Sequence, residues 1–303
     1  MKIVVIGAGA MGCLLHQKLR SQHSVWVLPK PDADTRKLTK HYRFTRLTGD
    51  NEQIPLSYIR VEQIGDADLI VCALKAYQMA QAIRYISPYL KANCPLILLH
   101  NGMGVLQQIR DNLTPNQAIG LMLSTQGARR LSPEHVQHTG QGQWQLGNYQ
   151  NLTSKNSAVQ LLIDQLDNCT WFEEIRTMQW TKLAINSVIN PLTAIHNVLN
   201  GQLAAPQYQA VIARLIDEVV TQARFANIAL DNDNLTQIVF QVIEQTGMNS
   251  SSMREDILAG RASEVDYING YLVKCATASN TLAPENQRCV TQIKSLEQQT
   301  TPP

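Results

Sequence analysis

Three polar residues recur at every fourth position of an otherwise apolar segment in the second half of the chain. Lys182, Asn186 and Asn190 stand there among leucine, isoleucine, valine and alanine residues. At about 3.6 residues per turn, this spacing places the three side chains along one face of a helix. A buried ammonium group needs polar partners, and together with two amides it can donate a proton and bind substrate oxygens. The face is therefore a candidate substrate site; a solvent-exposed face, or asparagines that cap helix ends, is the simpler alternative.

Comparable polar residues occur further along the chain, at Asn249, Ser252 and Glu264. Asn249 and Ser252 lie near the start of a predicted helix, where capping is the usual role of such residues. An acid such as Glu264 is ordinary in the first turn of a helix. These local roles stand beside a role in the same substrate site.

A glycine-rich loop follows the first apolar run of the chain, in the sequence Gly7-Ala8-Gly9-Ala10-Met11-Gly12. In a dinucleotide-binding loop, Gly7 would allow the tight turn, Gly9 the approach of the backbone to the pyrophosphate, and Gly12 the close packing of helix on strand. The pyrophosphate then lies at the helix N-terminus, which favours an anion. The loop predicts a Rossmann-type site for a dinucleotide, with a glycine turn that binds no ligand as the alternative.

The residues after the second apolar run bear on which dinucleotide is bound. An enzyme that uses NAD usually carries an acid at the end of the second strand for the ribose hydroxyls. Here Leu28 is followed by Pro29 and Lys30, and the acids Asp32 and Asp34 come later. The missing acid favours NADP(H), with Lys30 as a partner for the 2′-phosphate or, alternatively, as a solvated loop residue.

The two halves of the chain differ in periodicity. Apolar runs typical of buried parallel strands alternate with helical segments in the first half, at Ile3–Ile6, Ser24–Leu28, Leu69–Ala73 and Pro95–Leu99. Long helical periodicities follow, at Trp180–Ile195, Gln207–Ala226, Leu235–Thr246 and Val265–Ala278. We expect an α/β protein with a Rossmann doubly wound domain over residues 1–170, which contains a surface loop at Asn148–Asn156, and an all-helical domain over 171–303.

The composition of the 303 residues excludes several classes of protein. The net charge is +2 and no basic stripe is present, which argues against nucleic acid as a partner. The six cysteines are widely spaced without a Cys-x-x-Cys pair, so neither a metal site nor a redox couple is expected. The glycines interrupt the only apolar stretch that resembles a signal peptide, and no run reaches the ~20 residues that cross a bilayer. A cytoplasmic protein without membrane partners is predicted.

Several separate motifs, in order along essentially the whole chain, resemble the ketopantoate reductases, the NADPH-dependent 2-dehydropantoate 2-reductases of pantothenate biosynthesis. Beyond the glycine loop, the resemblance rests on Leu74-Lys75-Ala76, His100-Asn101-Gly102-Met103-Gly104, Ala128-Arg129-Arg130, Lys182 with Asn186, Asn190-Pro191-Leu192-Thr193-Ala194-Ile195, Asn200-Gly201, Asn249 to Met253 and Glu264-Val265-Asp266-Tyr267-Ile268-Asn269-Gly270.

The resemblance implies a role for each matching residue, with Lys182 as the general acid and a C-terminal domain like that of 6-phosphogluconate dehydrogenase. It places the substrate at Asn101, Lys182, Asn186, Asn190, Asn200, Asn249 and Ser252. It places the cofactor at Gly7, Ala8, Gly9, Ala10, Met11, Gly12, Lys75, Asn101, Ala128 and Glu264. This chain departs from close relatives at Lys30, where they carry an arginine whose planar fork a lysine cannot reproduce.

The implied reaction is the NADPH-dependent reduction of 2-dehydropantoate to (R)-pantoate, a keto-acid reduction by a monomer or homodimer. Two alternatives remain. The same two-domain build hosts other 2-keto and 3-hydroxy acid dehydrogenases. A non-catalytic nucleotide-binding regulator could keep the fold, but such a protein has no need of Lys182 and the asparagine face.

Overall fold

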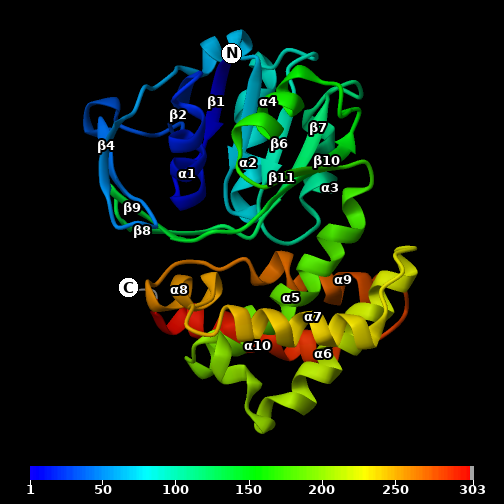
Figure 1. The fold of residues 1–303 in the computed structure, drawn as a ribbon. Helices are drawn as coiled ribbons and strands as arrows, with labels where there is room; N and C mark the ends of the chain where they lie inside the picture. The colour runs from blue at the N-terminus through cyan, green and yellow to red at the C-terminus, as the bar shows by residue number, and fades with distance from the viewer. Residues whose placement is uncertain (301–303) are drawn as a thin grey trace. The chain divides into compact units, whose positions relative to one another are not determined.

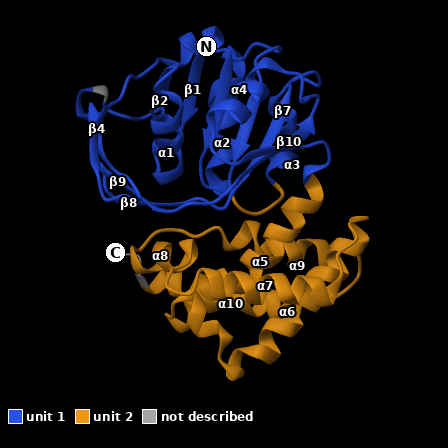
Figure 2. Cartoon of the chain, viewed as in Figure 1, with its two compact units in different colours: residues 1–100, 105–175 blue, residues 101–104, 176–303 orange. Residues whose placement is uncertain are grey.

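The computed structural model describes residues 1–300 and divides into two compact units (Figure 2). Unit 1 comprises Met1–His100 and Val105–Ile175, and unit 2 comprises Asn101–Gly104 and the chain from Arg176 onward. The division thus falls after Ile175 rather than between residues 170 and 171, because the last strand of unit 1 includes residues 169–172. Among the helices of residues 1–300, none is both long and apolar enough to span a bilayer.

Unit 1 is built on a seven-stranded sheet, and the apolar runs form its centre. Its strands, in spatial order, are β11 (Cys169–Phe172), β10 (Trp144–Gln150), β7 (Ile119–Ser124), β6 (Leu96–Leu99), β5 (Leu69–Ala73), β1 (Lys2–Ile6) and β2 (Ser24–Leu28). The neighbouring strands β7, β6, β5, β1 and β2 are parallel to one another, whereas β10 runs antiparallel to β7. The parallel order with β1 between β2 and β5 confirms the Rossmann-type prediction.

One detail of the sequence-based prediction was wrong. Asn148–Gln150 are not in a loop but continue β10, paired with β7 through a register shift at Asn148/Gln150. Their polar side chains suit an antiparallel strand near the edge of the sheet, which does not need the continuous apolar pattern of a buried parallel strand.

The helices of unit 1 lie between these strands in the chain (Figure 1). They are α1 (Ala10–Leu19), α2 (Ala76–Ile86), α3 (Val105–Ile109) and α4 (Ser157–Gln165), with short 3-10 helices at Thr35–Lys37, Val61–Asp66, Ser87–Tyr89 and Arg110–Asn112. Their buried faces contribute apolar residues such as Leu14, Leu15 and Leu162 to the core of the unit. This packing fixes the strand ends from which the cofactor-site residues emerge.

A second, four-stranded sheet was not expected from the sequence. It consists of β4 (Asn51–Pro55), β3 (His41–Thr45), β9 (His135–Gly140) and β8 (Gly127–Ser132), and Figure 1 shows it beside α1. Buried Tyr42 of β3 donates through its hydroxyl to Cys13 O at 2.8 Å, and Nδ1 of His16 lies 3.2 Å from the same hydroxyl oxygen. The hydroxyl hydrogen is already used, so Nδ1 of His16 is the donor in that bond. The sheet is thereby anchored on α1.

All of the regular secondary structure in the described part of unit 2 is helical, as the periodicities predict. Its helices are α5 (Ile175–His196, which begins at the last residue of unit 1), α6 (Pro206–Phe225), α7 (Asn232–Gln245), α8 (Ser252–Leu258), α9 (Asn269–Ala278) and α10 (Pro284–Thr300), with 3-10 helices η5 (Asn200–Ala204) and η6 (Val265–Tyr267). The helix expected over 265–278 is interrupted, because Ile268 has φ −104° and ψ −90° and separates η6 from α9.

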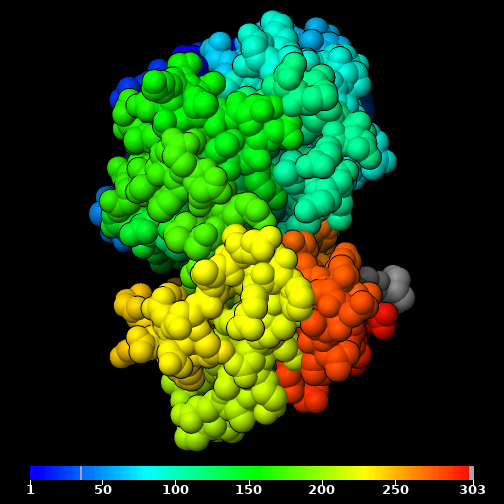
Figure 3. All heavy atoms as spheres, turned by 90° about the vertical axis from the view of Figure 1, so that its right-hand side faces the viewer, coloured from blue at the N-terminus to red at the C-terminus, as the bar shows by residue number. Residues whose placement is uncertain are grey.

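The core of unit 2 gathers apolar residues from α5, α6, α7, α9 and α10, with fully buried Trp180 and Val188 on α5. The end of α6 lies against the segment after α9, since Nε2 of Gln222 donates to Thr281 Oγ1 at 2.9 Å. The yellow and orange surfaces of these segments meet in the space-filling view (Figure 3).

Candidate active site

The glycine loop connects the end of β1 to the start of α1, as a Rossmann fingerprint requires. Gly7 has φ +103°, and a Cβ there would lie 2.4 Å from Ala73 O. A Cβ on Gly12 would lie 1.8 Å from Gly7 O, whereas nothing stands within 4 Å of one on Gly9. Two glycines are thus required by the packing of the protein itself, and the third leaves open space beside the backbone. Of the three glycines, only Gly9 therefore has space beside its backbone that a ligand can occupy.

The N-terminus of α1 is suited to an anion. Gly9 is the N-cap residue, no side chain caps the helix, and its first turn contains no acid. Its first backbone N–H groups are therefore not used by a cap and, with the helix dipole, favour a phosphate. The residues present fit the pyrophosphate of a dinucleotide.

The end of β2 at Leu28 carries no acid, as expected. Lys30 is exposed just beyond it. Asp34 is engaged locally: its carboxylate accepts from the backbone N and the guanidinium of Arg36, which lower its pKa. Asp32 is exposed in the same turn. Of the two nearby acids, Asp34 therefore already has Arg36 as its hydrogen-bond partner.

Sequence reasoning did not predict that Arg130 contacts the cofactor loop. Arg130 on β8 donates from its guanidinium to Ala8 O and, at 2.6 Å, to Pro133 O. It was visible only as a neighbour of Ala128, which is half-buried on the same strand. The unforeseen second sheet brings this cation to the glycine loop.

Lys75 lies at the same edge of the main sheet as the glycine loop. It is the N-cap residue of α2 and follows β5, which pairs in parallel with β1. The carboxyl ends of adjacent parallel strands lie at one edge, where open α/β sheets bind their ligands. Its predicted place beside the cofactor loop therefore agrees with the topology of the strands.

In unit 2, Lys182, Glu264 and Asn101 form a cluster. Nδ2 of Asn101 donates to Glu264 Oε2 at 3.3 Å, and Glu264 is 4 % exposed. Burial lowers the pKa of Lys182 to about 8, and the negative charge of Glu264 acts in the opposite direction. The alternative role of Glu264 as an ordinary first-turn acid was wrong, because Glu264 precedes η6, its side chain makes no capping hydrogen bond and it is buried.

The segment 101–104 is held to unit 2 by backbone contacts. The N–H of Met103 donates to Tyr267 O at 2.8 Å, and Nε2 of Gln179 donates to Gly102 O at 3.3 Å. Gly102 has φ +79°, and a Cβ there would lie 2.3 Å from Tyr267 O. Only glycine fits this approach, which keeps Asn101 beside Glu264.

The polar face predicted on α5 exists as a continuous helical face. Lys182, Asn186 and Asn190 all lie inside the 22-residue helix, so neither asparagine caps a helix end. Lys182 and Asn186 are half-buried, and Asn190 is 7 % exposed, so a fully solvent-exposed face was the wrong alternative. The face combines one ammonium group with two amides in mostly apolar surroundings.

Asn200 and Asn249 form a second polar cluster in unit 2. The N–H of Asn200 donates to Asn249 O at 3.0 Å, and its Nδ2 donates to Thr246 Oγ1 at 2.9 Å. Among the described residues, the buried Oδ1 of Asn200 has no hydrogen-bond partner. Buried polar atoms are normally paired, so this oxygen is a candidate acceptor for a ligand donor.

The capping role considered for Asn249 and Ser252 belongs to their neighbour Ser251. Oγ of Ser251 accepts from the N–H of Arg254 at 3.1 Å and from Thr193 Oγ1 at 2.7 Å. Ser252 is the exposed first residue of α8, and Asn249 is exposed before it. Both side chains are therefore left for other contacts, and Ser251 ties α8 to α5.

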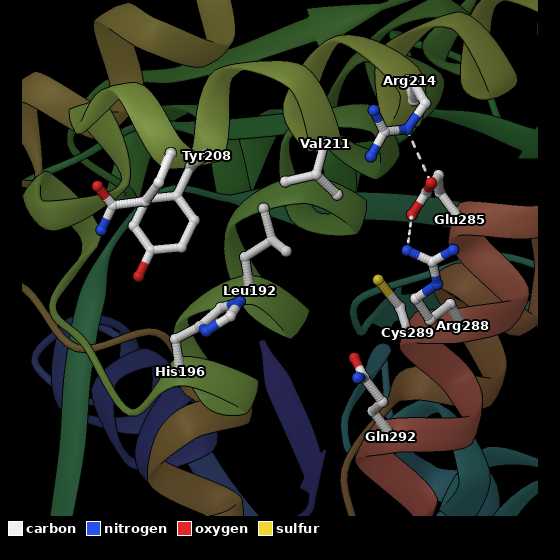
Figure 4. Close-up of a pocket in the computed structure, with 10 residues that line it drawn as sticks. Leu192, His196, Tyr208, Val211, Arg214, Glu285, Arg288, Cys289 and Gln292 are labelled. Atoms are coloured by element: carbon white, nitrogen blue, oxygen red, sulfur yellow. Dashed lines mark hydrogen bonds and ion pairs between the residues drawn. The ribbon is translucent and has the colours of Figure 1, made fainter.

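Lys182 is not among the residues that line two hollows in unit 2. The first, about 410 Å³, is lined by residues of α5, α6 and α10, and none of the predicted site residues is among them (Figure 4). There Glu285 pairs with Arg214 at 2.7 Å and with Arg288 at 3.3 Å, so its carboxylate offsets one of the two positive charges. The second, about 470 Å³, includes Asn249. Within residues 1–300, no group of three or more His, Cys, Asp or Glu is placed to hold a metal ion.

A Rossmann-type unit with a glycine loop, followed by a helical unit with a lysine, a carboxylate and amides, defines a two-domain oxidoreductase. Two family models match the chain: "Ketopantoate reductase PanE/ApbA" over residues 3–151 and "Ketopantoate reductase PanE/ApbA C terminal" over residues 174–297. The 2-dehydropantoate 2-reductase of Vibrio cholerae is 34 % identical over 98 % of both chains. The chain belongs to the ketopantoate reductase family.

Solved structures agree with this fold. A probable 2-dehydropantoate 2-reductase of Bacillus subtilis is 26 % identical, covers 98 % of this chain and 100 % of its own, and superposes with a TM-score of 0.83. A D-mandelate dehydrogenase solved with NADH and anilino(oxo)acetate is 23 % identical over 99 % of both chains, with a TM-score of 0.89. The second likeness concerns the fold alone.

Proposed function

We propose that this oxidoreductase reduces the C2 ketone of 2-dehydropantoate to the alcohol of (R)-pantoate, with NADPH as the reductant, in pantothenate biosynthesis. The observation that carries the proposal is the cluster of Lys182 with Glu264 and Asn101 in a family whose curated members bear this activity in their names. When bound, NADPH supplies the hydride for C2. The residues of the chain supply the proton and hold the substrate.

Lys182 is proposed as the general acid. Its ammonium group donates a proton to the ketone oxygen as that oxygen becomes an alkoxide, and the neutral amine regains a proton from water afterwards. A pKa lowered to about 8 leaves the group mostly protonated at pH 7, yet makes it a stronger acid than an exposed lysine. Glu264 keeps the ammonium charged, and Asn101 donates to Glu264 and so orients that carboxylate.

The asparagine side chains are proposed to bind the oxygens of the substrate. Amides donate to a carboxylate and accept from a hydroxyl without adding a charge that would repel the substrate. Oδ1 of Asn200 suits a substrate hydroxyl because it is buried without a described partner. The proposed substrate residues are Asn101, Lys182, Asn186, Asn190, Asn200, Asn249 and Ser252.

The cofactor is proposed to lie on the glycine loop of unit 1. Support comes from the uncapped N-terminus of α1 and the open space at Gly9. Lys75, Asn101 and Glu264 are proposed for the nicotinamide end and Ala128 for the same site. The absent acid after Leu28 and the exposed Lys30 favour NADPH over NADH, and Arg130 adds positive charge beside the loop.

The remaining assignments follow from this function. Unit 1, which ends at Ile175, is proposed as the NADP-binding domain, and unit 2, with Asn101–Gly104 and the chain from Arg176 onward, as the substrate-binding domain of a cytoplasmic enzyme. A monomer or homodimer is proposed; the solved ketopantoate reductase of Staphylococcus aureus is described as dimeric.

The test is the oxidation of NADPH by the purified protein with 2-dehydropantoate and a panel of other 2-keto acids. Phenylglyoxylate belongs in the panel because of the likeness in fold to D-mandelate dehydrogenase. We expect the highest kcat/KM with 2-dehydropantoate, and a preference for another keto acid would refute the substrate assignment.

Lys182→Ala tests the proton donor. It should lower kcat by about 10²–10⁴-fold, the usual contribution of a positioned acid. Lys274→Ala, at an exposed lysine of α9 in the same unit, is the matched control and should leave kcat unchanged. Near-normal kcat for Lys182→Ala would remove the lysine from the mechanism.

A further inference from the structure

The helix that carries the proposed substrate face contains a proline. Pro191 lies inside α5, directly after Asn190. Proline lacks the backbone N–H, and its ring crowds the carbonyl four residues earlier, so an interior proline usually kinks or ends a helix. α5 nevertheless continues to His196. The carbonyl that loses its helical partner belongs to Ser187, one turn before the proline.

A side chain from α9 takes the place of the missing donor. Nδ2 of Asn269 donates to Ser187 O at 2.9 Å, and both residues are 0 % exposed. A buried carbonyl without a donor is strongly disfavoured, because water cannot reach it. The contact between α9 and α5 therefore repairs the one hydrogen bond that Pro191 removes.

The direction of this hydrogen bond is fixed by a buried chain of partners. Nδ2 of Asn269 also donates to Asn286 Oδ1 at 2.9 Å, and Nδ2 of Asn286 donates to Glu218 Oε2 at 2.7 Å. Glu218 further accepts from the N–H groups of Glu285 and Asn286, in the first turn of α10, at 2.8 and 3.0 Å. An ionised carboxylate only accepts hydrogen bonds. It therefore orients both amides so that Asn269 donates one N–H to Asn286 and the other to Ser187.

We propose that Asn269 is a positioning residue for the reaction. By replacing the helical bond that Pro191 removes, it keeps the turn between Ser187 and Pro191 closed. Lys182 and Asn186, which precede this turn, then stay in register with Asn190 within it. The inference rests on the function proposed for this face, and it gives Asn269 a role that requires no contact with substrate.

A cycle of two substitutions tests the proposal. Asn269→Leu removes the donor and keeps the number and branching of the side-chain heavy atoms, whereas Pro191→Ala returns a backbone N–H that can donate to Ser187 O. We expect Asn269→Leu to lower kcat/KM for 2-dehydropantoate by about 10- to 100-fold, as displaced catalytic groups do. In the Pro191→Ala background, the same substitution should lower kcat/KM by no more than about threefold, because the two changes act on one carbonyl.

Gln222→Leu is the matched control for simple loss of stability. Gln222 is 1 % exposed, and its amide bonds to Thr281 and Ser279 rather than to α5. This variant should lower Tm while leaving kcat/KM within about twofold. An equal loss of kcat/KM for Asn269→Leu with and without Pro191→Ala, or a loss of Tm alone, would overturn the proposal.

Two further outcomes have defined meanings. If Asn269→Leu is insoluble alone, recovery of soluble, active protein by Pro191→Ala supports the proposal, and failure to recover it counts against it. If the wild type does not reduce 2-dehydropantoate, the proposed substrate is wrong, and the cycle is measured on the panel member that the wild type does reduce.

Discussion

The proton donor sets a pH dependence that can be predicted from the structure. Burial lowers the pKa of Lys182 from 10.5 to about 8, a shift that the Glu264 carboxylate limits. The side chain is then roughly nine-tenths protonated at pH 7 and roughly one-tenth at pH 9. Because the acid must carry its proton, kcat/KM should fall with a midpoint near pH 8 and about tenfold per pH unit above it. Steady-state rates with 2-dehydropantoate from pH 6 to pH 10 measure this limb.

Glu264→Gln is the perturbation that probes the cause. It removes the charge that raises the pKa of Lys182 but keeps an amide oxygen that can still accept from Asn101. The descending limb should move to lower pH, and each unit of movement corresponds to about 1.4 kcal/mol of lost interaction with the ammonium. A limb that stays in place or moves to higher pH in the variant, or a wild-type rate that is flat to pH 10, would refute the reasoning.

Three other expectations concern unit 1. Gly12→Ala should unfold or strongly destabilise the protein, because a Cβ there would lie 1.8 Å from the carbonyl oxygen of Gly7. Gly9→Ala should instead keep Tm and weaken NADPH binding, because nothing lies within 4 Å of a Cβ there. Thermal melts measure the first effect and fluorescence titration with NADPH the second. Lys30→Ala should raise the Kd for NADPH about threefold and leave the Kd for NADH unchanged. Arg130→Ala should raise the Kd for both cofactors. Equal effects of Lys30→Ala on the two Kd values would contradict the assignment of Lys30 to the 2′-phosphate. Burial lowers the pKa of His16 from 6.5 to about 4, so the unfolded chain binds more protons between these values. Its contribution to stability should therefore decrease as pH falls through this window, by about 2 kcal/mol between pH 7 and pH 5. Urea unfolding should show a loss about 2 kcal/mol smaller in His16→Gln than in the wild type, and an equal loss in the two proteins would contradict the assignment to His16.

The sequence predicted the features that depend on local pattern. Apolar runs such as Leu69–Ala73 became buried parallel strands, and the spacing of Lys182, Asn186 and Asn190 became one face of α5. In both cases the pattern of apolar and polar residues along the sequence indicates directly which side chains are buried. The glycine spacing likewise predicted a tight strand-to-helix turn, which Gly7 and Gly12 now explain by contact.

Features that depend on distant pairing were not predictable in this way. The sheet formed by β3, β4, β8 and β9 joins residues about 90 positions apart, as in the pairing of Phe44 with Val136, and its strands are short and mixed in polarity. Arg130 therefore gave no sign of its place beside Ala8. In the same way, nothing near Asn269 in the sequence indicates that its partner is Ser187.

The segment Asn101–Gly104 belongs to unit 2 although the residues on both sides of it belong to unit 1. A C-terminal fragment cut at Arg176 would therefore lack Asn101, the hydrogen-bond donor to Glu264, and Gly102, the acceptor of Gln179. Chimeras between members of this family face the same constraint. An exchange of the helical half alone would pair a Glu264 from one parent with an Asn101 segment from the other, so the four residues 101–104 should be exchanged together with it.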